Sequence, residues 1–137
     1  MTAKIFVLIA SSIFLILGTI HIVYTFFTNK FLARDDETNK KMKSTSPILT
    51  NETSVWNAWI GFNASHSAGA MFIGLINIML VCQHFEVYQN SFNILLLDIC
   101  TGLFYLFLAK KYWFKIPLIG ILIATSCFIV AILLLMK

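Results

Sequence analysis

Residues 5–27 read IFVLIASSIFLILGTIHIVYTFF, a run without Asp, Glu, Lys or Arg. A helix rises about 1.5 Å per residue, so this run can cross the roughly 30 Å hydrocarbon core of a bilayer. Further apolar runs cover residues 56–81, 92–109 and 116–136. A backbone in lipid has to satisfy its own hydrogen bonds, so each run is expected to be helical. The sequence therefore predicts an all-α integral membrane four-helix bundle, with residues 1–137 as a single transmembrane domain.

The composition excludes several classes of protein. Of the 137 residues, 59% are hydrophobic and only 12% are charged, whereas a soluble domain carries roughly 25% charged residues. Too few polar side chains remain to cover a surface that faces water, which argues against a soluble enzyme and a disordered chain. The net charge of +4 is typical of a membrane protein with basic cytoplasmic loops, so no nucleic-acid partner is expected. The first apolar run exceeds a signal-peptide h-region and is expected to be retained.

Basic residues indicate how the helices are oriented. Most of them fall between the first and second runs or between the third and fourth: Lys30, Arg34, Lys40, Lys41, Lys43, Lys110, Lys111 and Lys115. Only Lys4 and Lys137 stand on the opposite side. Loops rich in Lys and Arg stay in the cytoplasm, so both termini are predicted to be non-cytoplasmic.

The basic cytoplasmic loop, residues 28–55, is the only sizeable polar segment. Asp36 with Lys40, and Glu37 with Lys41, have the i,i+4 spacing that favours a short surface helix. Pro47 is expected to stop that helix. Because charged runs are usually solvated, this loop is interpreted as a connector rather than a docking surface.

Three ionisable residues lie inside the apolar runs: His21, His66 and Asp98. Their depths from the cytoplasmic ends are roughly 10, 15 and 18 Å, from the helix rise. A charge at mid-bilayer costs roughly 2.5–3.5 kcal/mol on insertion scales, so such groups indicate a functional site by default. Each histidine alone is more typical of a satisfied interior residue. Asp98 is expected to be protonated or paired with a histidine.

The faces of the predicted helices place further residues beside these three. Steps of three and four residues stack on one side of a helix, which groups Trp59, Asn63 and His66 on the second run. Tyr24 stands beside His21, and Tyr105 shares a side with Asp98. Asn63 and Asn77 are expected to hydrogen-bond between helices. The candidate ligand-binding residues are His21, Tyr24, Trp59, Asn63, His66, Asp98 and Tyr105.

Several functions fit such a site. The favoured hypothesis is a binding site for a lipid or small lipophilic ligand. The alternatives are an enzyme in which His66 and Asp98 act as a catalytic acid–base pair on a lipophilic substrate, an accessory subunit or homodimer within a membrane complex, and a bis-histidine haem protein. A metal site with two histidines and one carboxylate fits the residue count, but no ligand motif such as HxxxH supports it, so no metal is predicted and no cofactor is identified.

Four stretches carry a resemblance: HIVYTFFTNKF from His21, MKSTSPILT from Met42, WNAWIGFNASHSAG from Trp56 and AKKYWFKIPLIGI from Ala109. Together they resemble a family of small four-helix bacterial integral membrane proteins of unassigned function. The resemblance runs over most of the chain and implies a multi-pass protein of the bacterial inner membrane. It implies no activity, ligand or catalytic residue.

Overall fold

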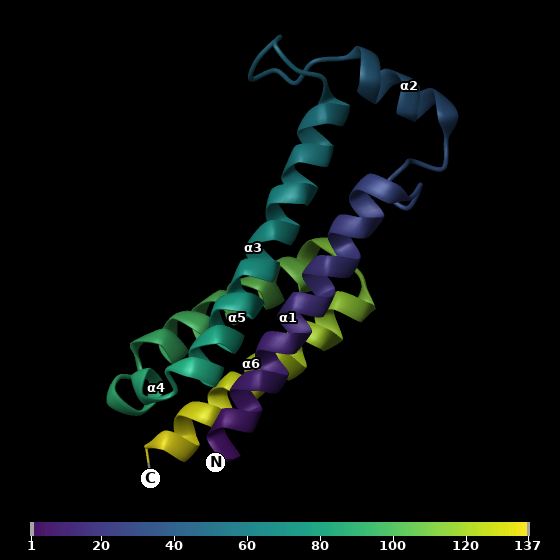
Figure 1. Ribbon diagram of the computed structural model, residues 1–137. Coiled ribbons are helices and arrows are strands. Elements are labelled where there is room, and N and C mark those ends of the chain that lie inside the picture. Colours follow the sequence, from purple (N-terminus) through teal and green to yellow (C-terminus); the bar gives the residue numbers. More distant parts are fainter. Residues whose placement is uncertain (1, 137) are drawn as a thin grey trace. The chain divides into compact units, whose positions relative to one another are not determined.

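The computed structural model describes residues 2–136, and within that range every regular element is a helix. The helices in chain order are α1 (Thr2–Phe27), α2 (Asp36–Ser44), α3 (Val55–Gln83), α4 (Glu86–Asn90), α5 (Asn93–Tyr112) and α6 (Lys115–Leu135) (Figure 1). The predicted all-α fold is confirmed.

Four of these helices, α1, α3, α5 and α6, are long and apolar enough to cross a membrane. Their bounds agree with the predicted runs to within about three residues, as expected when length and hydropathy define the element. The side of the membrane on which the termini lie stays a prediction.

The polar segment between α1 and α3 contains the predicted short surface helix, α2. Asp35 caps its N-terminus, because Oδ2 of Asp35 accepts a hydrogen bond from the backbone nitrogen of Thr38 at 2.7 Å. Lys41 and Glu37 form the expected i,i+4 pair, with 2.7 Å between Nζ and Oε1. The helix ends at Ser44, before Pro47. Helix α4 lies between the apolar runs 56–81 and 92–109, and no helix is predicted there, because its single turn has no apolar periodicity to reveal it.

The chain divides into two compact units. The terminal unit comprises Met1–Leu17 together with Ala70–Lys137, and the middle unit comprises Gly18–Gly69. Helices α1 and α3 each contribute one part to each unit. The single domain expected from the sequence stays a prediction.

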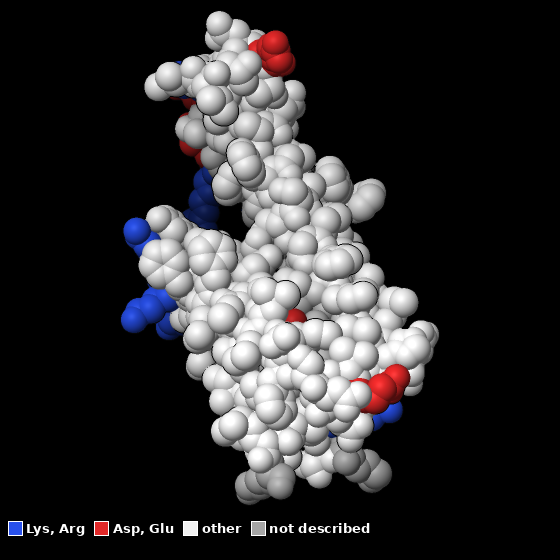
Figure 2. Space-filling model, turned by 90° about the vertical axis from the view of Figure 1, so that its left-hand side faces the viewer, with Lys and Arg blue, Asp and Glu red and all other residues white. Residues whose placement is uncertain are grey.

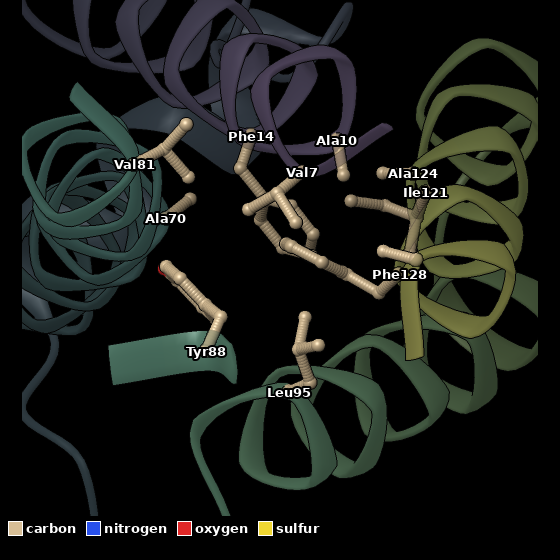
Figure 3. Packing of buried hydrophobic residues seen from close by; sticks show 11 residues of the cluster. Val7, Ala10, Phe14, Ala70, Val81, Tyr88, Leu95, Ile121, Ala124 and Phe128 are labelled. Carbon is tan, nitrogen blue, oxygen red and sulfur yellow. The ribbon is translucent and has the colours of Figure 1, made fainter. Parts of the chain in front are cut away.

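The terminal unit has an apolar core built from all of its helices (Figure 3). Phe14 of α1 and Phe128 of α6 are fully buried, and their ring centroids are 6.2 Å apart. Leu95 of α5 and Tyr88 of α4 extend toward the same space in Figure 3. The core thus joins the two ends of the sequence by direct side-chain packing.

Glycines allow the long helices of the terminal unit to approach closely. A Cβ atom added to Gly74 of α3 would lie 2.7 Å from the backbone nitrogen of Leu15 and from the carbonyl oxygen of Ser11 in α1. Gly102 of α5 meets the hydroxyl of Thr125 in α6 in the same way. Small residues at such contacts are the usual means by which helices pack in membranes.

The outer faces of the long helices carry large exposed apolar side chains, among them Phe62, Phe72, Leu97 and Phe104. Residues other than Lys, Arg, Asp and Glu cover most of the face shown in Figure 2. A water-facing surface rarely exposes apolar patches of this extent, whereas lipid solvates them. The surface therefore fits the predicted transmembrane helices.

Candidate functional site

The middle unit brings two of the predicted site residues into direct contact. Nε2 of His21 in α1 lies 2.9 Å from Oδ1 of Asn63 in α3. The amide nitrogen of Asn63 donates to the carbonyl oxygen of Trp59 at 2.8 Å, which turns Oδ1 toward the histidine. With the amide in this orientation, His21 is the donor. The prediction that Asn63 bonds between helices is confirmed.

His66 lies beside this pair. The rings of His21 and His66 meet edge to face, with centroids 5.4 Å apart and planes at 76°. Ser67, which follows His66 in α3, donates its hydroxyl hydrogen to the carbonyl oxygen of Asn63 one turn earlier, at 2.8 Å. His21, Asn63 and His66, the polar cluster, therefore form one contiguous group within the middle unit.

An aromatic side chain separates the polar cluster from a groove. The ring of Phe31, which follows α1, contacts the His21 ring at 4.8 Å between centroids, and it contacts the Trp59 ring at 6.0 Å. Phe31 and Trp59 also line an open groove of about 370 Å³, together with Lys30, Leu32, Ala33 and Met42. This volume lies within the range of small-molecule sites, roughly 300–1,000 Å³.

Asn39 of α2 holds one wall of this groove in place. Its side-chain nitrogen donates to the carbonyl oxygen of Ala33 at 2.8 Å, and its Oδ1 accepts from the Ala33 nitrogen at 2.8 Å. Asn39 is buried although it lies on a short polar helix. These two hydrogen bonds anchor α2 to the segment that follows α1, and Lys30, Phe31, Leu32 and Ala33 of this segment line the groove.

The groove carries one positive charge. Among the described residues that line it, Lys30 is the charged one, and the others are apolar. Between residues 2 and 136 the ion pairs are Lys41 with Glu37 and His84 with Glu86, so the Lys30 ammonium has no carboxylate partner there. An apolar groove with one cation at its edge suits an amphiphile with a negative head.

The structure places Asp98 in the terminal unit, where its partner is an amide. Nδ2 of Asn77 in α3 donates to Oδ1 of Asp98 in α5 at 2.9 Å. The hydroxyl of Tyr88 in α4 donates to Oδ1 of the same Asn77. The interhelical hydrogen bond expected of Asn77 is confirmed. His21, Asn63 and His66 belong to the middle unit. The sequence groups Asp98 with them in one candidate ligand-binding site, and this grouping stays a prediction.

The predicted tyrosines lie in different surroundings. Tyr24 is exposed, and its carbonyl oxygen accepts from the Thr28 hydroxyl at 2.9 Å. Tyr105 is half-buried in the terminal unit, with its ring 5.7 Å from Phe14 and 6.0 Å from Trp113 between centroids. Neither residue lines the groove of the middle unit.

Metal ligands are not gathered in the part of the chain that the structure describes. Residues 2–136 contain no group of three or more His, Cys, Asp or Glu side chains that could hold a metal ion. The three cysteines, Cys82, Cys100 and Cys127, are free thiols. The imidazole groups of the polar cluster offer hydrogen bonding and proton exchange.

Sequence reasoning missed two contributors to these sites. Asn39 and Tyr88 stand in polar or loop-like sequence, where an amide or phenol ordinarily faces water. Only burial distinguishes them from their neighbours, and no periodic pattern reveals it. Phe31 also contributes to the site, and here the sequence does carry a signal, because an aromatic residue stands in an otherwise polar loop.

Comparisons of the chain with protein-family models, with curated proteins and with solved structures found no match. The resemblance to small four-helix bacterial membrane proteins therefore stays a prediction, and the function rests on the site itself.

Proposed function

We propose that this protein binds an amphiphile, an acyl chain with an anionic headgroup, in the groove of the middle unit. The observation that carries the proposal is the lining of the groove: Phe31, Leu32, Ala33, Met42 and Trp59 provide apolar surface, and Lys30 provides a positive charge that has no carboxylate partner among residues 2–136. Burying one methylene group contributes about 0.8 kcal/mol, so a short acyl segment is enough for measurable affinity.

The polar cluster gives this groove a second recognition element. Phe31 touches both the groove and the His21 ring. A rotation of the Phe31 side chain would expose the His21–Asn63 hydrogen bond to a bound headgroup. A headgroup oxygen would then compete with Oδ1 of Asn63 for the Nε2–H of His21.

We further infer that the protein is a multi-pass protein of the bacterial inner membrane, with the groove at its cytoplasmic face. The asymmetry of Lys and Arg between the loops supports this orientation. Aromatic and basic side chains also associate as they do at membrane interfaces. Nζ of Lys43 lies 5.4 Å from the Trp56 ring centroid, and Nζ of Lys111 lies 5.1 Å from that of Tyr112.

Quenching of Trp59 fluorescence tests the proposed binding. The full chain, carrying Trp56→Phe and Trp113→Phe so that Trp59 is the only tryptophan, is titrated in detergent micelles with dibrominated stearate. The uncharged methyl ester of the same acid is the matched probe. We expect saturable quenching by the acid and weaker binding of the ester.

Two variants separate a specific site from partition into the micelle. Lys30→Gln should weaken binding of the acid about fivefold, which corresponds to about 1 kcal/mol for one lysine near an anionic group. Lys41→Gln, which removes a charge outside the groove, should leave binding unchanged. Linear quenching that is equal for both probes and all variants would refute the proposal.

A further inference from the structure

Asp98 is a buried carboxyl group of the terminal unit. The side chain is 7% exposed, and its two oxygens differ. Oδ1 accepts the hydrogen bond from Asn77, whereas Oδ2 is buried and has no hydrogen-bond partner among residues 2–136. An ionised carboxylate has about four acceptor sites to satisfy, and this one receives a single N–H.

The neighbouring polar groups have no proton left to offer Oδ2. One hydrogen of the Asn77 amide goes to the carbonyl oxygen of Ile73 at 3.0 Å, and the other goes to Oδ1 of Asp98. The single hydroxyl hydrogen of Tyr88 goes to Oδ1 of Asn77. The network is therefore complete except at Oδ2.

No positive charge compensates Asp98 within the described residues, because it takes part in none of their ion pairs. On its own helix the nearest cation is Lys110, about 18 Å away by helix rise. On the other elements, Nζ of Lys4 lies 5.9 Å from the Phe85 ring centroid, and Glu86 contacts His84. An unpaired anion that is buried between two helices of membrane-spanning length is strongly unfavourable in free energy.

We propose that Asp98 is a proton-binding site, at which the carboxyl group is held as a neutral acid with its proton on Oδ2. Oδ1 then keeps its hydrogen bond from Asn77, and no charge is left between α3 and α5. Release of the proton places an unpaired charge between these two helices, so proton binding at Asp98 is coupled to their packing. Asp98, Asn77 and Tyr88 are not among the residues that line the amphiphile groove.

Infrared spectroscopy tests this assignment without relying on a variant. Aspartate labelled with carbon-13 in its side-chain carboxyl is incorporated into the full chain, which contains only Asp35, Asp36 and Asp98. At neutral pH we expect a carboxylic-acid C=O band that shifts with the isotope. If labelled aspartate contributes carboxylate bands alone, the proposal is wrong.

Matched variants then assign the band. Asp98→Asn should remove it, and Asp36→Asn, which changes an exposed aspartate, should leave it in place. Persistence of the band in folded Asp98→Asn protein would also overturn the assignment. If Asp98→Asn does not fold, the labelled wild-type spectrum together with Asp35→Asn and Asp36→Asn still decides it, because the band must survive both.

Discussion

The side-chain amide of Asn77 lies 2.9 Å from Oδ1 of Asp98, and this hydrogen bond links two membrane-length helices, α3 and α5. The same amide accepts from Tyr88 of α4. One asparagine thus satisfies polar groups on two other helices inside an otherwise apolar core. The arrangement makes Asn77 the residue on which the polar network of the terminal unit depends.

Removing this amide should destabilise the terminal unit. Asn77→Ala leaves the Tyr88 hydroxyl and both Asp98 oxygens without partners, which costs about 1–3 kcal/mol for unsatisfied buried groups. A single interhelical hydrogen bond in a membrane averages only about 0.6 kcal/mol, so the larger loss would reflect the shared network. The midpoint of thermal unfolding in detergent measures the effect. Asn57→Ala, at an exposed position of α3, is the control and should leave the midpoint unchanged.

Tyr88 should remain neutral in strongly alkaline solution. Burial raises the pKa of its hydroxyl above the ordinary value of 10.0. A group whose pKa is raised in the folded state contributes stability below its unfolded pKa and loses that contribution as pH rises through the folded pKa. Ultraviolet titration should therefore show a late-ionising tyrosine component that is lost in Tyr88→Phe. An unchanged titration curve in that variant would contradict the burial of the hydroxyl.

Gly74 and Gly61, both in α3, should respond to alanine in opposite ways. A Cβ at Gly74 meets the backbone of α1, which cannot move aside cheaply, so Gly74→Ala should cost about 1–3 kcal/mol through overpacking. At Gly61 no atom lies within 4 Å of the added Cβ. Gly61→Ala should thus be neutral or stabilise the helix by up to about 1 kcal/mol. Thermal unfolding of both variants checks the contrast, and equal losses would show that a partner covers Gly61.

The N-terminus of α2 should loosen in acid. The side-chain hydrogen bond from Thr38, followed by the bond from its backbone, lowers the pKa of Asp35 below the usual 3.8. The cap therefore contributes fully above about pH 3.8 and is lost as pH falls through the lowered pKa. The amide resonance of Thr38 reports this transition. Asp35→Ser should retain the cap and abolish its pH dependence, whereas Asp35→Ala should lose the cap at every pH.

The long helices could be predicted because the bilayer imposes simple rules on the sequence. A run such as residues 5–27 has a length and an apolar content that only a spanning helix satisfies. The i,i+4 spacing of Glu37 and Lys41 likewise predicted α2. Helix α4 had neither signal, since a single turn is fixed by the contacts of Tyr88 rather than by its own sequence.

For the candidate sites, too, the sequence revealed some features and not others. Asn63 and Asn77 could be identified as residues that hydrogen-bond between helices, because a polar side chain in an apolar run needs a partner. Which partner each one takes depends on helix rotation and register, and hydropathy does not encode these. Asn39 shows most clearly that the sequence does not reveal the partner. Its sequence context is that of a solvated helix, yet its side chain forms two hydrogen bonds with the backbone of Ala33, which lines the groove.

The sequence by itself determined that the chain is helical and that four of its helices are long and apolar enough to cross a membrane, because both properties follow from local composition and helix rise. Only the tertiary structure decided that His21 meets Asn63 and His66, that Asp98 meets Asn77, and that Phe31 stands between a groove and the polar cluster. These pairings depend on how side chains from distant segments pack at contact distance, and close packing is a property of the folded chain as a whole.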